Sequence, residues 1–127
     1  MKKTVLVVED NERNRKLVRT ILKFRGFEVV ECDDGEPALG LAKQHRPALV
    51  LMDIELPKMD GIAALKTLRE DPATSAIPVI AVTASVTPGE RERVTAAGFN
   101  GYLAKPLDMD AFNQMVDRLA GPGGEVA

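Results

Sequence analysis

The stretch ALVLMDIELPKMDG, residues 48–61, begins as an apolar run and ends in a turn. Leu49 to Met52 are four consecutive apolar residues, and they lead directly into the carboxylate of Asp53. Such a run is typical of a central strand in a parallel sheet, because that kind of strand is buried on both faces. An unpaired buried charge is costly, so Asp53 must either close a turn or have a functional partner.

Similar short apolar runs recur along the chain and alternate with segments that have helical periodicity. We expect strands at residues 4–8, 28–32, 49–52, 79–83 and 101–104. We expect helices at residues 12–25, 36–45, 61–70 and 88–98, and from 108 to about 119. This strict alternation predicts an α/β fold in which a five-stranded parallel sheet has helices on both faces.

The order of the strands follows from how apolar each one is. The first, third and fourth expected strands are continuously apolar and therefore belong in the centre of the sheet. The second contains Glu28 and Glu31, and the fifth is short and contains Gly101 and Tyr102, so these two belong at the edges. The order 2-1-3-4-5, with right-handed crossovers, satisfies these conditions.

Composition and charge limit the classes of protein to which the chain can belong. Its 127 residues, 45% hydrophobic and 28% charged, predict one globular domain at residues 1–120 and a flexible tail at 121–127. A net charge of −2 provides no basic field for nucleic acid. No apolar segment approaches the roughly 20 residues that span a membrane. The single cysteine, Cys32, cannot form an internal disulfide, so we expect a cytoplasmic protein with Cys32 packed in an edge strand.

Polar side chains follow four of the five expected strands. Glu9 and Asp10 come after the first strand, and Asp53 ends the apolar run of the third. Thr83 ends the fourth strand and Lys105 follows the fifth. Ligands of such sheets bind at the rim where the carboxyl ends of the strands meet. The sequence therefore predicts three carboxylates, a hydroxyl and an ammonium group at one rim.

This set of side chains is suited to phosphoryl transfer. Three carboxylates repel each other unless a cation lies among them, and oxygen ligands suit Mg²⁺ or Mn²⁺. An aspartate such as Asp53 can act as a nucleophile toward phosphorus. The charge on the transferred group must be neutralised, which the metal and Lys105 could do. Thr83 could donate a hydrogen bond to a further phosphoryl oxygen.

Four segments together resemble a known family. They are VVEDN, LMDIELPKMDG, VTA and YLAKP, in this order and on the expected strands. With these segments the chain resembles the receiver domain of two-component response regulators, from Lys3 to about Leu119. The resemblance implies a flavodoxin-like (βα)5 fold, in agreement with the expected strand order.

The resemblance also implies a role for each residue of the acidic rim. Asp53 is implied to be the phosphoacceptor. Asp10 is implied to bind Mg²⁺ directly and Glu9 through water. Asp53 and the backbone carbonyl of Glu55 are implied to complete the protein ligands.

A conformational switch is implied as well. Thr83 matches the switch hydroxyl of the family and Tyr102 the switch aromatic. Lys105 is implied to bind the phosphoryl group, and its peptide bond to Pro106 is implied to be cis. Gly61 has a simpler explanation, as a backbone requirement of the turn after Asp60.

A receiver domain is a signalling protein rather than an enzyme that turns over a substrate. The resemblance implies that a histidine kinase or histidine phosphotransferase supplies the phosphoryl group. Because the chain ends in the tail, we expect no output domain. The phosphorylated form would instead bind a downstream protein through the fourth helix, fifth strand and fifth helix. Single-domain regulators of the cell-cycle type resemble the chain at least as well as the chemotaxis type.

Three alternative functions are weaker. A flavodoxin-like electron carrier would need a hydroxyl-rich phosphate loop and aromatic residues around the flavin, but aromatics make up only 4% of the chain. An aspartyl-nucleophile phosphatase would have a second acid where Glu55 stands, but also a cap for which the chain has no room. A receiver that binds partners without being phosphorylated stays open as the alternative function.

Two further features have surface roles in this interpretation. Arg15 and Arg19 lie on a basic side of the first helix, for which we treat docking on an acidic kinase or phosphotransferase as a hypothesis. His45, the only histidine, is expected at the surface at the end of a helix.

Overall fold

The computed structural model describes residues 3–84 and 87–121. The strands are β1 (Thr4–Val8), β2 (Glu28–Cys32), β3 (Leu49–Asp53), β4 (Val79–Thr83) and β5 (Gly101–Ala104). The helices are α1 (Glu12–Phe24), α2 (Ala38–His45), α3 (Gly61–Glu70), α4 (Pro88–Ala97) and α5 (Met109–Ala120). Apart from Gly121, the tail expected at 121–127 lies outside the described residues.

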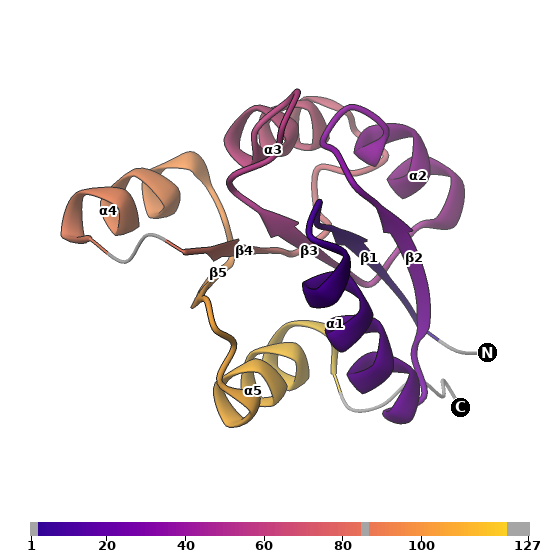
Figure 1. Cartoon of the computed structure of the whole chain (residues 1–127). Coiled ribbons are helices and arrows are strands. Elements are labelled where there is room, and N and C mark those ends of the chain that lie inside the picture. Colours follow the sequence, from indigo (N-terminus) through magenta and orange to yellow (C-terminus); the bar gives the residue numbers. More distant parts are fainter. Residues whose placement is uncertain (1–2, 85–86, 122–127) are drawn as a thin grey trace.

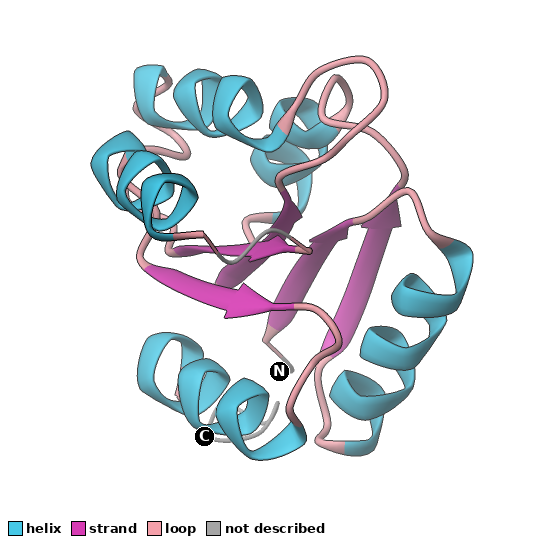
Figure 2. Ribbon diagram, turned by 60° about the vertical axis from the view of Figure 1, so that its left-hand side comes forward, coloured by secondary structure: helices cyan, strands magenta, loops and turns pink. Residues whose placement is uncertain are grey.

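All strands are parallel and lie in the order β2-β1-β3-β4-β5, which confirms the predicted sheet. The central strands β3 and β4 are buried along their whole length, whereas the edge strands β2 and β5 are mostly half-buried. Helices α1 and α5 cover one face of the sheet, and α2, α3 and α4 cover the other (Figure 1). Figure 2 shows the sheet as the middle layer between these two groups.

Alternate residues of the strands point into two separate cores, because side chains alternate across a strand. Val5 and Val7 of β1 belong to the core shared with α1 and α5. Leu6 and Val8 belong to the core shared with α2 and α3. Burial of both faces holds the central strands in place, so the residues at their carboxyl ends stand on a rigid support.

Four helices begin after a polar residue whose side chain accepts a backbone N–H three residues further on. These residues are Asn11 for α1, Asp60 for α3, Thr87 for α4 and Asp108 for α5. Because Asn11 caps α1, the side chains of Glu9 and Asp10 are available for the rim of the sheet.

Several predicted boundaries are wrong by one or two residues, among them the C-terminal ends of α1 and α4. Helix α2 begins at Ala38 instead of residue 36, because the Ala38 N–H donates to the Gly35 carbonyl in a turn and the first helical bond runs from the Leu41 N–H to the Pro37 carbonyl. Strand β3 extends one residue further than predicted, because Asp53 still pairs with Val82 of β4. The functional carboxylate is therefore the last residue of a hydrogen-bonded strand rather than the first residue of a loop.

Cys32 and His45 lie where the sequence predicts them. Cys32 is half-buried at the end of edge strand β2, and burial raises the pKa of its thiol to about 11. His45 is exposed and is the last residue of α2. Among the described residues, none of the helices has the length and apolar character needed to cross a bilayer.

Candidate functional site

Three carboxylates converge at the carboxyl ends of β1 and β3. Oxygen atoms of Glu9, Asp10 and Asp53 lie within 4.8 Å of one another. Asp53 is 2% exposed and Glu9 is 5% exposed, whereas Asp10 is open to solvent. Two of the three acids are thus almost entirely withdrawn from water, although a solvent-facing third acid lies beside them.

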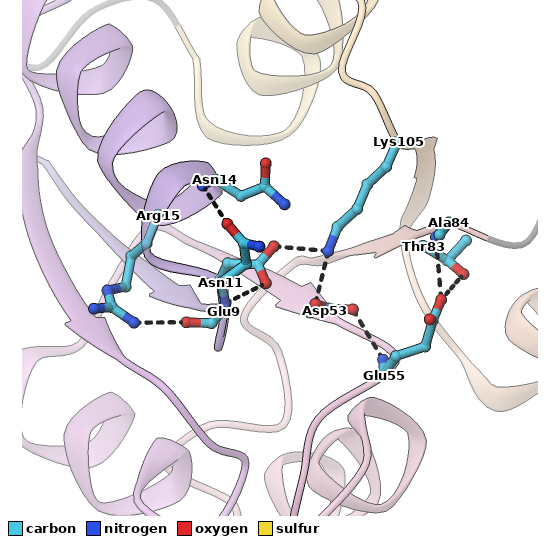
Figure 3. Close-up of polar contacts among 9 residues, drawn as sticks. All are labelled: Glu9, Asn11, Asn14, Arg15, Asp53, Glu55, Thr83, Ala84 and Lys105. Atoms are coloured by element: carbon cyan, nitrogen blue, oxygen red, sulfur yellow. Dashed lines mark hydrogen bonds and ion pairs between the residues drawn. The ribbon is translucent and has the colours of Figure 1, made fainter.

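Lys105 supplies the positive charge within this acidic cluster. Its Nζ atom lies 2.8 Å from Oδ2 of Asp53 and 2.9 Å from Oε1 of Glu9 (Figure 3). Burial by itself lowers the pKa of Lys105, but the two carboxylates outweigh it and raise that pKa above its ordinary value. The lysine therefore stays protonated and bridges β5 to β1 and β3.

Within this cluster, the surroundings of Glu9 raise its pKa and so disfavour its ionised form. Burial, together with the neighbouring Asp53 carboxylate, raises the pKa of Glu9 from 4.5 to about 7. Lys105 and the backbone N–H of Asn11 act in the opposite direction without cancelling this effect. A further positive charge at the cluster would favour the ionised form of Glu9.

The loop after β3 holds Asp53 in a fixed orientation. The backbone N–H of Glu55 donates to Oδ1 of Asp53 at 2.9 Å, so both carboxylate oxygens have a donor. Gly61 is buried against this loop, and a Cβ there would lie 2.5 Å from the carbonyl oxygen of Asp53. The backbone requirement at Gly61 is therefore one of close approach, since its φ is not positive.

Thr83 ends β4 and is fully buried, and its hydroxyl points toward the loop after β3. The Oγ1 atom of Thr83 donates to Oε1 of Glu55 at 3.0 Å, and the backbone N–H of Ala84 donates to the same oxygen at 3.1 Å. The resemblance implied a role for the backbone carbonyl of Glu55, and the position of this residue two places after Asp53 was a further signal. The contact of its side chain with Thr83 was not predicted.

Tyr102 stands apart from the acidic cluster. It is half-buried in β5 and packs against the small apolar group formed by Ile54, Ala81 and Val94. The guanidinium of Arg91, on α4, lies 6.0 Å from the centre of its ring.

Near the site, the chain leaves β5 through Lys105 and Pro106. The peptide bond between these two residues is cis.

Asp34 is a residue near the site for which the sequence predicted no role. Its buried carboxylate accepts the backbone N–H of Gly35 at 2.7 Å and that of Met59 at 3.2 Å. Although burial alone would raise it, these N–H groups hold the pKa of Asp34 below its ordinary value. Asp34 thereby ties the loop after β2 to the loop after β3, and the Asp-Gly pair was its only sequence signal.

Arg15 and Arg19 on α1 are engaged within the molecule. Arg15 lies 3.3 Å and Arg19 2.9 Å from the carboxylate of Glu31 on β2. Arg15 also donates to the backbone carbonyl of Glu9 at 3.0 Å. Arg15 therefore helps to place the rim, and the hypothesis that the two arginines dock a partner stays a prediction.

Comparison with known proteins places the chain in a family. The model of the response regulator receiver domain matches residues 5–117. The chain therefore belongs to the receiver domains of response regulators, the signalling proteins of two-component systems.

Among curated relatives, it is 41% identical to the polar-differentiation response regulator DivK of Brucella anthropi. That match covers 95% of this chain and 98% of DivK. The DivK of Brucella ovis is 40% identical over the same shares.

Solved structures agree with this assignment. The receiver domain of the sensor histidine kinase PA1611 from Pseudomonas aeruginosa is 34% identical, with a TM-score of 0.87 over 95% of this chain and 99% of that one. That structure holds a magnesium ion in its active-site cleft. The chemotaxis protein CheY4 of Vibrio cholerae is 27% identical, with a TM-score of 0.87 over 94% of this chain and 99% of that one.

Proposed function

We propose that this receiver accepts a phosphoryl group on Asp53 from a phosphohistidine of a partner histidine kinase or phosphotransferase. The observation that carries the proposal is the setting of the Asp53 carboxylate. It is buried at the end of a central strand, oriented through one oxygen by the Glu55 N–H and paired through the other with Lys105. A nucleophile needs this combination of fixed direction and nearby positive charge.

The acidic cluster fits a hard divalent cation. Its donors are all oxygen atoms, and three carboxylates lie within 4.8 Å of one another. Asp10, Asp53 and Glu9 would hold Mg²⁺ or Mn²⁺, together with the backbone carbonyl of Glu55. When bound, the cation neutralises negative charge on the transferred group. Magnesium in the cleft of the Pseudomonas receiver supports this choice of metal.

In the transfer step, a carboxylate oxygen of Asp53 attacks the phosphorus atom of the phosphohistidine. The new P–O bond forms as the P–N bond breaks, and the electron pair of that bond stays on the imidazole nitrogen. The Lys105 ammonium remains protonated and donates to a phosphoryl oxygen. Thr83 and the Ala84 N–H are the donors available at the end of β4.

The readout is a change in protein binding. Movement of Thr83 toward the phosphoryl group would open space that Tyr102 can occupy, and this would remodel the surface of α4, β5 and α5. Such a shift is limited to the difference in binding energy between the two states, typically a few kcal/mol. In this proposal the chain acts in the cytoplasm, where a downstream protein binds the remodelled surface.

Intact-mass analysis after incubation with acetyl phosphate and Mg²⁺ tests the proposal. Wild type should gain the mass of one phosphoryl group, and Asp53→Asn should gain none. If wild type gains none, the phosphorylation-independent interaction module becomes the better description.

A further inference from the structure

Arg15 of α1 joins the connection between β1 and α1 to the edge strand β2. Its Nη1 atom donates to the backbone carbonyl of Glu9 at 3.0 Å (Figure 3). Its Nε atom lies 3.3 Å from Oε1 of Glu31 on β2, and the side chain of Arg15 is only 22% exposed. A single guanidinium therefore ties a backbone atom of the acidic rim to a neighbouring strand.

The carbonyl that Arg15 binds belongs to the peptide unit between Glu9 and Asp10. A peptide unit is planar, so a hydrogen bond to its carbonyl also fixes its N–H and the Cα atom of Asp10. The N–H of Glu9 is held as well, since it donates to the carbonyl of Cys32 at 3.0 Å. Both backbone polar groups of Glu9 are thus bound, and the chain enters Asp10 in a defined direction.

Asp10 depends on this backbone more than the other two acids of the cluster do. Glu9 and Asp53 are buried, and each pairs with Lys105. Asp10 is exposed, so packing does not restrict its carboxylate. Its place beside the other two acids therefore follows from the peptide that carries it.

We propose that Arg15 is a positioning residue for the divalent-cation site, because it holds the Glu9–Asp10 peptide and so directs the Asp10 carboxylate toward Glu9 and Asp53. This inference rests on the cation site of the proposed function. Arg15 acts through the backbone of Glu9 and is not itself a ligand. Removal of a group that orients metal ligands from outside typically lowers the affinity for the metal about 10–100-fold.

The sign of the effect separates positioning from simple electrostatics. Arg15 carries a positive charge beside a site for a cation, so by charge alone its removal would tighten the binding of Mg²⁺. Loss of positioning would weaken that binding instead. The two explanations therefore predict opposite changes in the Kd for Mg²⁺.

Arg19 provides a matched control on the same helix. Its Nη1 atom lies 3.0 Å and 2.9 Å from the two carboxylate oxygens of Glu31, the residue that also pairs with Arg15. Of the two arginines, it is Arg15 that donates to the Glu9 carbonyl. Arg19→Ala therefore removes the same charge and a partner of the same glutamate, but leaves the Glu9–Asp10 peptide held.

Isothermal titration calorimetry of the full chain with Mg²⁺ tests the inference. Arg15→Ala should raise the Kd about tenfold, whereas Arg19→Ala should stay within about twofold of wild type. Arg15→Lys should lie between them, because an ammonium group can reach the Glu9 carbonyl but lacks the fork that also holds Glu31. An unchanged or lower Kd in Arg15→Ala would overturn the inference, as would an equal rise in Arg19→Ala.

Phosphorylation by acetyl phosphate gives a second readout, which a general loss of structure would not reproduce. The rate constant of Arg15→Ala should fall at low Mg²⁺ and return to within about twofold of wild type at saturating Mg²⁺. A deficit that persists at saturation would overturn the positioning role, because Arg15 would then act on the transfer step or on the fold.

A third measurement needs neither Mg²⁺ nor a phosphodonor. The ¹⁵N order parameter of the Asp10 amide should fall in Arg15→Ala and keep its wild-type value in Arg19→Ala. An unchanged order parameter in Arg15→Ala would contradict the hold on this peptide. Absence of Mg²⁺ binding in wild type as well would reject the cation site of the proposed function itself, and the order parameter would then decide whether Arg15 holds the peptide.

Discussion

The rim at β1 and β3 and the region of α4 and β5 are built very differently. At the rim, Glu9, Asp53 and Lys105 are tied by short ion pairs, and Glu9 and Asp53 lie at the ends of strands that are buried on both faces. Helix α4 packs on the rest of the molecule with far fewer buried side chains, since Val94 is the one buried residue among its described positions. By contrast, α3 buries Gly61, Ala64, Leu65 and Leu68.

The difference matches the two tasks of the proposed function. Chemistry at Asp53 needs groups held in one geometry, whereas a signal requires an element that can move at low cost. Segments with few buried apolar contacts open most readily in proteins. The structure thus combines a rigid acceptor site with a lightly anchored helix that can respond to it.

Substitutions in the core give the strongest test of the contrast between the rim and α4. Leu65→Ala should lower the free energy of unfolding by about 2–5 kcal/mol, because it leaves a cavity under α3. Val94→Ala removes less apolar surface and should cost about 1–2 kcal/mol. Denaturant unfolding measures both, and hydrogen exchange should show that Val94→Ala loosens α4 but leaves β1 and β3 protected. Equal costs, or faster exchange in β1, would contradict the contrast between the two regions.

Removing the positive charge at the rim should have the next largest effect. Lys105→Met should slow phosphorylation by acetyl phosphate about 100-fold or more, since it deletes a donor aimed at the developing charge. Lys43→Met is a matched control, because Lys43 pairs with Asp71 on the surface of the molecule. A rate constant within a few-fold of wild type would exclude Lys105 from the transfer step.

Glu9 should make stability depend on pH when Mg²⁺ is absent. Its pKa is about 7 in the folded protein and 4.5 ordinarily, so the folded state binds more protons between these values. The stability that Glu9 contributes is therefore full below pH 4.5 and is lost as the pH rises through 7.

Thermal unfolding between pH 4 and 8 measures this contribution of Glu9 to the stability of the fold. The loss should disappear in Glu9→Gln and should shrink when Mg²⁺ is added. A pH profile that is identical in wild type and Glu9→Gln would show that Glu9 is not held in this way.

The smallest expected effect concerns the contact between Arg91 and Tyr102. Arg91→Ala should weaken the attachment of α4 by about 0.5–1 kcal/mol, the range for an exposed cation–π contact. Hydrogen exchange in α4 should therefore become faster. Arg93→Ala, which removes the ion pair to Glu90 instead, is the control. Equal effects of the two variants would remove any special role for the Tyr102 contact.

The sequence predicted the sheet and the acidic rim because these depend on local patterns. Three continuous apolar runs identify the central strands, and a parallel sheet must bring their carboxyl ends together. Strand order places Asp53 and Lys105 at the same edge of the sheet, and the length of the lysine side chain lets it reach Asp53 past β4.

The side-chain contact of Glu55 and the role of Asp34 were not predicted, because both depend on contacts between loops. Glu55 reaches Thr83, and Asp34 reaches the backbone of Met59, across gaps of more than 20 residues. Which rotamer a side chain adopts, and how closely two loops approach, is decided by packing that no local pattern encodes.

The proposed function depends on Asp53 being the residue that carries the phosphoryl group. The most direct test treats the protein with acetyl phosphate and Mg²⁺, reduces the acyl phosphate with borohydride and sequences the peptides by mass spectrometry. Homoserine is expected at position 53 and at no other aspartate. Modification at Asp10 or Asp34 with Asp53 unchanged would contradict it.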